Sequence, residues 1–294
     1  MIGPLAFENI TIDNISAFCK NEITADVLRL DKMHPVISGN KWFKLRYYLE
    51  EAKSQNKKAI LTFGGAWSNH IIATAATCQM NGLKSIGIIR GEEPKQLSPT
   101  LLHAKDLGMQ LIFISRTAYQ YKEIPAAIHS EEYYIVNEGG YGIMGARGAS
   151  TILELSNNNY THYCCAVGTG TMMAGFVNHG SAEQKIVGIS VMKNNTALEE
   201  MIQAITDNKT KSWKLIHDYP FRGYAKHQPG LLHFMNEFYK KTGIPTDFVY
   251  TGKLFYAIAD LISKNYFPAG SRLLLIHSGG LQGNESLLPG SLIF

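Results

Sequence analysis

The chain has 294 residues, of which 45% are hydrophobic, so it can bury the core of one large or two medium domains. The 28 Lys and Arg only slightly outnumber the 24 Asp and Glu and form no basic run, so the chain is not expected to bind nucleic acid. No apolar stretch is long enough to span a membrane, so no membrane partner is expected. The N-terminus lacks the pattern of a signal peptide and the four cysteines form no CxxC pair, so we expect a cytoplasmic protein with buried thiols and no metal site.

The first strong helix signal begins at Lys41, directly after the turn residues 38 to 40. Apolar residues recur at spacings of three and four, which predicts a packed helix face: Trp42, Leu45, Tyr48 and Leu49. An ammonium in the first turn of a helix lies at the positive end of the helix dipole, which disfavours it. On this stretch alone, a surface lysine tolerated at modest cost is the simpler interpretation.

Apolar, β-rich runs then alternate with amphipathic segments. Strands are expected at 59 to 65, 85 to 91, 109 to 115, 132 to 140, 160 to 168, 185 to 192, 212 to 217 and 272 to 280. Helices are expected at 69 to 82, with Ser68 as N-cap, at 98 to 108 and 144 to 156, from 171 and from 196, and at 229 to 242 and 251 to 264. Such alternation predicts an α/β protein built on doubly wound parallel sheets.

There are too many strands for one compact sheet, so we expect two domains. The asparagine run 157 to 159 is the natural boundary. A smaller α/β domain is predicted at 49 to 156, and a larger one at 1 to 48 plus 157 to 294. Ligands of parallel sheets bind beyond the carboxyl ends of the strands, so the site is expected in the cleft between the domains.

Polar or glycine-rich turns follow four of the expected strands, near residues 63, 167, 249 and 277. The most specific turn contains Gly168, Thr169, Gly170 and Thr171 and precedes a helix. It offers unhindered backbone N–H groups and a positive dipole end to an anion, most naturally a phosphate. A tight structural connection is the alternative.

Two nucleotide-binding motifs fit this turn poorly. A dinucleotide fingerprint needs Gly or Ala where Met173 stands, and an acidic residue after the next strand, which ends "SVMKNN". A P-loop needs Gly-Lys-Ser/Thr, which is absent from the sequence. The phosphate, if bound here, belongs to another kind of ligand.

The sequence resembles the pyridoxal-phosphate enzymes of the tryptophan synthase β-like fold (fold type II), and within them the 1-aminocyclopropane-1-carboxylate deaminase and D-cysteine desulfhydrase group. The resemblance covers nearly the whole chain and rests on an ordered set of short motifs: "GNKWFKL" at 39, "GGAWSNH" at 64, "GTGTMMAG" at 168, "GYAK" at 223, "YTGK" at 250 and "HSGG" at 277. It implies a homodimer that uses pyridoxal 5'-phosphate to act on a small amino acid.

The resemblance also implies how the cofactor is held. Lys41 forms its Schiff base, Asn69 bonds its phenolic oxygen, and residues 168 to 171 hold its phosphate. Thr251 and Ser278 lie beside its pyridine nitrogen. A Schiff-base lysine must be a neutral amine for part of the time, and both burial and a helix N-terminus favour that form, so the position of Lys41 becomes functional.

Three further residues are implied to be catalytic. Ser68 matches an acid/base or nucleophilic serine, and Tyr224 and Tyr250 match tyrosines that face the substrate. Without the resemblance, Ser68 reads as a helix cap and the tyrosines as packed aromatic residues. The sequence departs from the family at Trp67 and at 71 to 72, where Gln and Thr-Arg are usual, and a tryptophan at the cleft is expected to reshape the substrate pocket.

The hydroxyls of Thr251 and Ser278 help to predict which substrate the enzyme uses. Family members that open the cyclopropane ring carry an acidic residue at the pyridine nitrogen, which keeps it protonated. A hydroxyl is compatible with a neutral pyridine, which is a milder electron sink and suits a substrate with a good leaving group on Cβ. We therefore expect β-elimination from D-cysteine or a related D-amino acid, giving a 2-oxo acid and ammonia. The alternatives are a 1-aminocyclopropane-1-carboxylate deaminase and, from another class, a non-catalytic pyridoxal-phosphate-binding protein.

Overall fold

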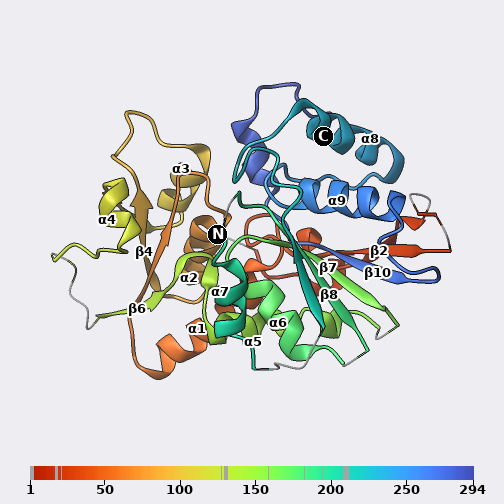
Figure 1. Cartoon of the computed structure of the whole chain (residues 1–294). Coiled ribbons are helices and arrows are strands. Elements are labelled where there is room, and N and C mark those ends of the chain that lie inside the picture. Colours follow the sequence, from red (N-terminus) through yellow and green to blue (C-terminus); the bar gives the residue numbers. More distant parts are fainter. Residues whose placement is uncertain are drawn as a thin grey trace.

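The computed structural model describes residues 3–16, 19–20, 22–126, 128, 132–157, 159–181, 183–193, 195–207 and 212–294. Within them the strands form two sheets (Figure 1). The larger has the order β1 (Ile12–Asn14), β2 (Thr24–Arg29), β10 (Arg272–His277), β7 (His162–Val167), β8 (Lys185–Ser190) and β9 (Trp213–Ile216). The smaller has the order β5 (Met109–Ile114), β4 (Lys84–Arg90), β3 (Ala59–Gly64) and β6 (Tyr133–Val136).

All strand pairs are parallel except β1 with β2. The predicted fold class, α/β with two parallel sheets, is confirmed. We call the parts built on the two sheets the large unit and the small unit. The limits predicted for the two domains, and a site between them, stay predictions. Residue 158, in the asparagine run chosen as the boundary, lies outside the described residues.

Helices flank both sheets (Figure 1). They are α1 (Lys41–Ser54), α2 (Asn69–Met80), α3 (Pro99–Asp106), α4 (Arg116–Gln120), α5 (Ile143–Ser150), α6 (Thr171–His179), α7 (Leu198–Ala204), α8 (Pro229–Thr242) and α9 (Thr251–Ser263). The start of α1 at Lys41 and the cap of α2 are confirmed, since the Ser68 hydroxyl accepts from the Ile71 N–H at 3.3 Å. No helix among the described residues is long and apolar enough to cross a bilayer.

The helix expected at 144 to 156 is shorter than predicted. It ends at Ser150 and is followed by a separate 3-10 turn, Leu153–Leu155. The hydroxyls of Ser150 and Thr151 donate to the carbonyl oxygens of Arg147 and Gly148, at 2.7 and 2.8 Å. Such local bonds compete with continuation of the helix. The expected buried thiols are also only partly correct, because Cys78, Cys164 and Cys165 are buried but Cys19 is half-buried.

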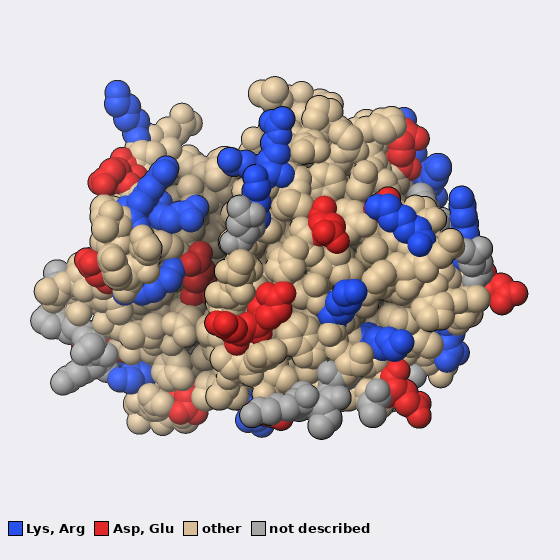
Figure 2. All heavy atoms as spheres, viewed as in Figure 1, with Lys and Arg blue, Asp and Glu red and all other residues tan. Residues whose placement is uncertain are grey.

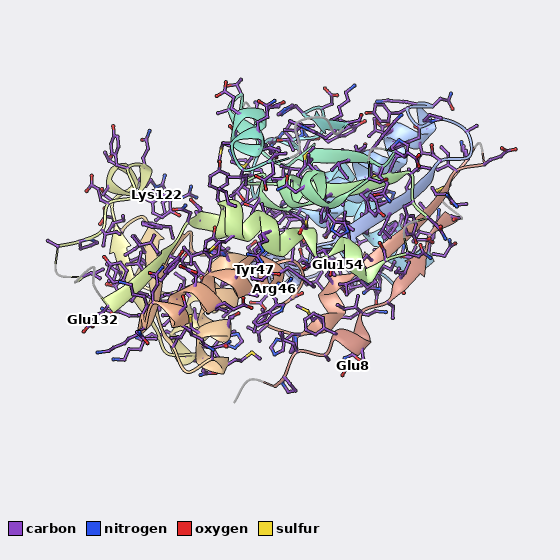
Figure 3. The ribbon with its side chains drawn as sticks, turned by 90° about the horizontal axis from the view of Figure 1, so that it is seen from below. Glu8, Arg46, Tyr47, Lys122, Glu132 and Glu154 are labelled. Carbon is purple, nitrogen blue, oxygen red and sulfur yellow. The ribbon has the colours of Figure 1, made fainter. Side chains whose placement is uncertain are left out.

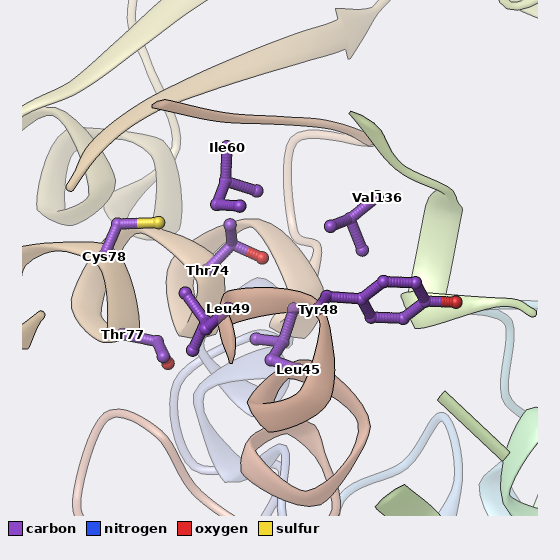
Figure 4. A pocket seen from close by; sticks show the side chains of 8 residues that line it. All are labelled: Leu45, Tyr48, Leu49, Ile60, Thr74, Thr77, Cys78 and Val136. Atoms are coloured by element: carbon purple, nitrogen blue, oxygen red, sulfur yellow. The ribbon is translucent and has the colours of Figure 1, made fainter. Parts of the chain in front are cut away.

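Helix α1 packs on the small unit through Leu45, Tyr48 and Leu49, which meet Ile60 of β3. Figure 4 shows this seam between α1, α2 and the sheet, which is filled by side chains and leaves no space for a water molecule. The predicted domain boundary after residue 48 falls inside this helix. The seam fixes the axis of the helix that begins with Lys41.

Helix α5 lies between α1 and α6 and contacts both through glycines. A Cβ at Gly148 would overlap the carbonyl oxygen of Phe43 in α1, and a Cβ at Gly175 of α6 would overlap the carbonyl oxygen of Ala146. The backbones therefore approach more closely than any larger residue permits. This contact sets the distance between the first turn of α1 and the first turn of α6.

We expect Gly148→Ala to lower the free energy of unfolding by about 1–3 kcal/mol, because the added methyl group must push α1 and α5 apart. The matched control is Gly230→Ala in α8, where a Cβ would meet nothing within 4 Å and alanine favours the helix by about 0.5–1 kcal/mol. Urea unfolding of the two variants beside the unmodified protein measures both effects. Equal stability of the two variants would refute the close contact.

Candidate active site

Lys41 lies at the start of α1 with its side chain buried. Its Nζ donates to Oδ1 of Asn40 at 2.7 Å and lies 5.8 Å from the centre of the Tyr250 ring. Burial lowers the pKa of Lys41 to about 8, although the charge of Asp247 acts in the opposite direction. A substantial fraction of this lysine is therefore a neutral amine near pH 8, as a nucleophile requires.

The loop before α1 is locked to the loop after β10. The Asn40 N–H donates to the Ser278 carbonyl oxygen at 3.3 Å. Gly39 has φ +72°, and a Cβ there would overlap the same carbonyl group; Gly279 also has φ +72°, and a Cβ there would press on Ser38. Only glycine fits such a backbone crossing. It brings Lys41 and Ser278 together from opposite ends of the chain.

The predicted anion turn opens α6. Gly170 has φ +83°, and the hydroxyls of Thr169 and Thr171 lie 2.9 Å apart at the start of the helix. Gly168 lies against the ring of Tyr250, since a Cβ there would be 3.2 Å from Cε1. The first N–H groups of a helix have no partner within the helix, so the turn presents free donors at the positive dipole end.

Lys44 is a site residue that our sequence analysis missed. It is buried one turn after Lys41, and burial and the Lys41 charge place its pKa well below the usual value. No acidic side chain of the described residues forms an ion pair with it. Gly140 packs on the Lys44 side chain, and Gly145 packs on Gly140 and on Thr171, which places Lys44 near the anion turn.

The signal that could have identified Lys44 is its spacing of three from Lys41, which puts both lysines on one face of the helix. The more accessible side of α1 carries Arg46 and Tyr47 (Figure 3). The guanidinium carbon of Arg46 lies 4.6 Å from the centre of the Tyr47 ring. The buried face of α1 thus places Lys41 and Lys44 together, where a bound anion would favour their charged forms.

His70 forms part of the same buried region and is neutral. Its Nε2 lies 2.8 Å from the Thr62 hydroxyl, which itself donates to the Val136 carbonyl oxygen, so Nε2 is the donor. Burial and the charges of Lys41 and Lys44 lower the pKa of His70 to about 3. Its Nδ1 is a buried acceptor without a partner among the described residues.

Asn69 is held by the loop that follows β10. Its Oδ1 accepts from Nε2 of Gln282, and its amide nitrogen lies against Gly280, where φ is +96° and a side chain would overlap it. Gln282 was not among the predicted site residues, because nothing in its sequence neighbourhood marks it. These contacts orient the Asn69 amide before any ligand binds.

Ser68 precedes Asn69, and its hydroxyl caps α2. Among the described residues this is the only hydrogen bond of the Ser68 side chain, and it is not bonded to Lys41, Tyr224 or Tyr250. The catalytic role of Ser68 stays a prediction. Trp67 is 38% exposed, and its place at the substrate pocket stays a prediction, whereas the departures at 71 and 72 are isoleucines buried in the core of the small unit.

Tyr224 and Tyr250 lie together, with their hydroxyls 3.1 Å apart and their ring centres 6.0 Å apart. Burial and the neighbouring Tyr224 raise the pKa of Tyr250 well above its usual value, so the pair is protonated near neutral pH. Lys253 of α9 holds the Tyr224 loop, because its Nζ donates to the carbonyl oxygens of Gly223 at 2.7 Å and Pro220 at 3.1 Å.

Asp247 organises the start of α9. Its buried carboxylate accepts from the N–H groups of Val249, Tyr250 and Thr251 and from the Thr251 hydroxyl at 2.7 Å. The Thr251 hydroxyl also accepts from the Asp247 N–H. Thr251 is therefore committed to Asp247, whereas the hydroxyl of Ser278 makes no hydrogen bond to the described residues.

Pyridoxal phosphate, the cofactor implied by the sequence, fits this arrangement. Lys44 is a buried lysine without an acidic partner among the described residues, and a phosphate at the anion turn would favour its charged form, while Lys41 supplies an amine of lowered pKa. The Asn69 amide and the Ser278 hydroxyl are the polar groups that would face the phenolic oxygen and the pyridine nitrogen of the cofactor ring. The described residues contain no cluster of three or more potential metal ligands.

Comparison with known proteins agrees with this chemistry. Residues 10–279 match the family model described as pyridoxal-phosphate dependent enzyme. A putative 1-aminocyclopropane-1-carboxylate deaminase of Thermotoga maritima is 29% identical over 87% of this chain and 88% of the relative. A bifunctional D-cysteine desulfhydrase/1-aminocyclopropane-1-carboxylate deaminase of Arabidopsis thaliana is 27% identical over 84% and 70%.

Solved structures share the fold. A crystal structure of an ACC deaminase homologue superposes with a TM-score of 0.80 at 24% identity, covering 97% of this chain and 92% of the other. The O-acetylserine dependent cystathionine β-synthase of Helicobacter pylori gives 0.70 at 16% identity, covering 97% and 98%. Because the family model spans most of the sequence, the chain belongs to the pyridoxal-phosphate dependent enzymes.

Proposed function

We propose that this enzyme eliminates the β-substituent of a small D-amino acid such as D-cysteine and releases a 2-oxo acid and ammonia. Thr251 and Ser278 are expected beside the pyridine nitrogen, and Ser278 carries the proposal, because its hydroxyl makes no hydrogen bond to the described residues whereas that of Thr251 donates to Asp247. The nearby carboxylate of Asp247 already accepts four hydrogen bonds, so it is directed at the start of α9 and not at the ring. The name of the Arabidopsis relative supports the same reaction.

The cofactor, when bound, supplies the sink for the electrons released at Cα. Its phosphate would be held by the turn 168 to 171 and by Lys44, and its ring oriented by Asn69. Lys41 would hold it covalently, and the neutral amine of Lys41 would move the Cα proton. Tyr250 and Tyr224 offer hydroxyl protons to the departing group, and Ser68 is proposed as an acid/base or nucleophilic residue.

A 1-aminocyclopropane-1-carboxylate deaminase is the second candidate function. The printed names of several relatives favour it, including that of Thermotoga maritima. Ring opening has no good leaving group on Cβ, so it depends on a strong electron sink and on a protonated ring nitrogen. The hydroxyls in this chain favour the elimination.

We further propose that the enzyme is a cytoplasmic homodimer. Its four cysteines are all free, which suits a reducing compartment. The dimer rests on the family resemblance, and sedimentation of the loaded protein tests it. Neither nucleic acid nor membrane is a proposed partner.

The lowered pKa of Lys41 predicts how the apoenzyme takes up its cofactor. Only the neutral amine attacks the aldehyde, so the rate at which visible absorbance develops should rise with pH and be half-maximal near pH 8. Asp247→Asn removes the charge that raises the pKa of Lys41, so its midpoint should move to lower pH. Lys41→Ala should develop no lysine-bound absorbance, and a midpoint near the ordinary lysine value would contradict the buried amine.

Lys44→Met should weaken cofactor binding about 10- to 100-fold, the usual effect of losing a charge-assisted hydrogen bond to a buried anion. Lys53→Met, which removes an exposed lysine near the end of the same helix, is the control and should bind the cofactor normally. Equilibrium dialysis against pyridoxal phosphate measures both. Equal affinities would show that Lys44 does not contact the phosphate.

Side-by-side assays of 2-oxo acid release test the reaction itself. D-cysteine or β-chloro-D-alanine should give pyruvate faster than 1-aminocyclopropane-1-carboxylate gives 2-oxobutanoate, and the L-enantiomers should react more slowly. Ser68→Ala should lower kcat if its hydroxyl moves a proton, and should raise only KM if it positions the substrate. Faster ring opening by the unmodified enzyme would reverse the assignment.

A further inference from the structure

A cavity in the small unit has no part in the mechanism above. It lies at the carboxyl ends of β4 and β5, has a volume of about 560 Å³ and is lined by residues that include Ala66, Arg90, Glu92, Phe113 and Arg116. This volume accommodates a group much larger than the thiol of cysteine. The cavity therefore has room for a larger substituent than the thiol of D-cysteine.

The cavity adjoins the turn that carries Ser68 and Asn69. Ile89 pairs with Gly64 in the parallel register of β4 and β3, so Arg90 leaves its strand beside Gly65. A terminal guanidinium nitrogen of Arg90 is 3.8 Å from where a Cβ of Gly65 would stand. Ala66, in the same turn, lines the cavity, which thus begins next to the predicted substrate site.

Both arginines are free to bind an anion. Neither Arg90 nor Arg116 forms an ion pair with an acidic side chain of the described residues, and Glu92 is the one acidic residue in the lining. The Arg90 guanidinium lies 5.9 Å from the centre of the Tyr119 ring. Figure 2 shows Lys and Arg side chains grouped on the upper part of the small unit, among acidic ones.

The charge of Arg90 reaches the catalytic tyrosines. Burial raises the pKa of Tyr224, and Arg90 is one of the groups that act against this rise, whereas Glu138 and Asp247 add to it. Glu138, whose effect on the pKa of Tyr224 is larger than that of Arg90, forms an ion pair with Lys122 and none with Arg90. A substrate bound at Tyr224 is thus within electrostatic reach of an unpaired guanidinium.

We propose that this cavity receives a second acidic group, carried on the β-substituent of the substrate. The inference rests on the proposed function and narrows its substrate class to β-substituted amino acids whose leaving group bears a carboxylate, sulfonate or phosphate. Guanidinium groups bind such anions through two parallel hydrogen bonds, which gives both affinity and orientation. Trp67 stands between Ala66, which lines the cavity, and Ser68, and its side chain is partly exposed.

S-carboxymethyl-D-cysteine is a suitable probe. In its elimination the Cα proton is removed, the electron pair of the Cβ–S bond leaves with sulfur as mercaptoacetate, and water then releases pyruvate and ammonia. Its amide, S-carbamoylmethyl-D-cysteine, has the same shape and leaving atom but no second charge. The ratio of the two kcat/KM values isolates the contribution of the acidic group.

The loaded enzyme should prefer the carboxylate over the amide about tenfold or more, and Arg90→Gln should reduce that ratio about tenfold, with a smaller effect from Arg116→Gln. Lys84→Gln, which removes a charge at the opposite end of β4, is the matched control and should keep the ratio. A ratio near one in the unmodified enzyme, or a preference that survives both arginine substitutions, would overturn the proposal.

Binding gives a second readout that does not require turnover. The change in visible absorbance on adding each compound reports its dissociation constant, and the carboxylate should bind about tenfold more tightly than the amide unless Arg90 is replaced. If no compound, D-cysteine included, yields a 2-oxo acid, the proposed function fails, while this affinity ratio still decides the cavity. Pyruvate release from D-cysteine without a charge-dependent ratio refutes the cavity alone.

Discussion

The site depends on the crossing of two backbones, at Gly39 and at Ser278. One segment leads into the helix that begins with Lys41, and the other leaves the central strand β10. Because both Gly39 and Gly279 have positive φ and no room for a side chain, the crossing has a single geometry. From it follow the position of Lys41, the place of Ser278 and, through Gly280, the orientation of Asn69.

Two buried lysines lie next to this crossing, and a buried carboxylate lies farther from it. Lys41 and Lys44 lie buried on one face of α1 without an acidic partner at hydrogen-bond distance, while Asp247 acts on Lys41 from farther away and is itself satisfied by the start of α9. Burial lowers the pKa of both lysines, and a bound anion would favour the charged form of Lys44. The fold is thus preorganised for a phosphate and for an amine near its pKa.

The sequence predicts much of the fold because β-rich runs and caps are local signals; the start at Lys41 and the Ser68 cap needed no tertiary information. The end of α5 was missed because hydroxyl bonds from Ser150 and Thr151 compete with the helix ladder. The role of Gln282 depends on a contact with Asn69, 213 residues away, and the commitment of Thr251 to Asp247 is a local turn at the start of α9 that periodicity does not encode. Motif order predicts the site residues, and packing sets the hydrogen bonds around them.

The central place of β10 has a consequence for synthesis on the ribosome. This strand lies between β2 and β7, yet it is the last strand of the chain to be made. The four strands of the smaller sheet, of which β6 is the last in the chain, are all made before β10. The small unit can therefore fold while the edges of β2 and β7 that later pair with β10 are still unpaired. The predicted site is completed only after residues near 280 have been made, so we expect cofactor capture to follow synthesis of β10.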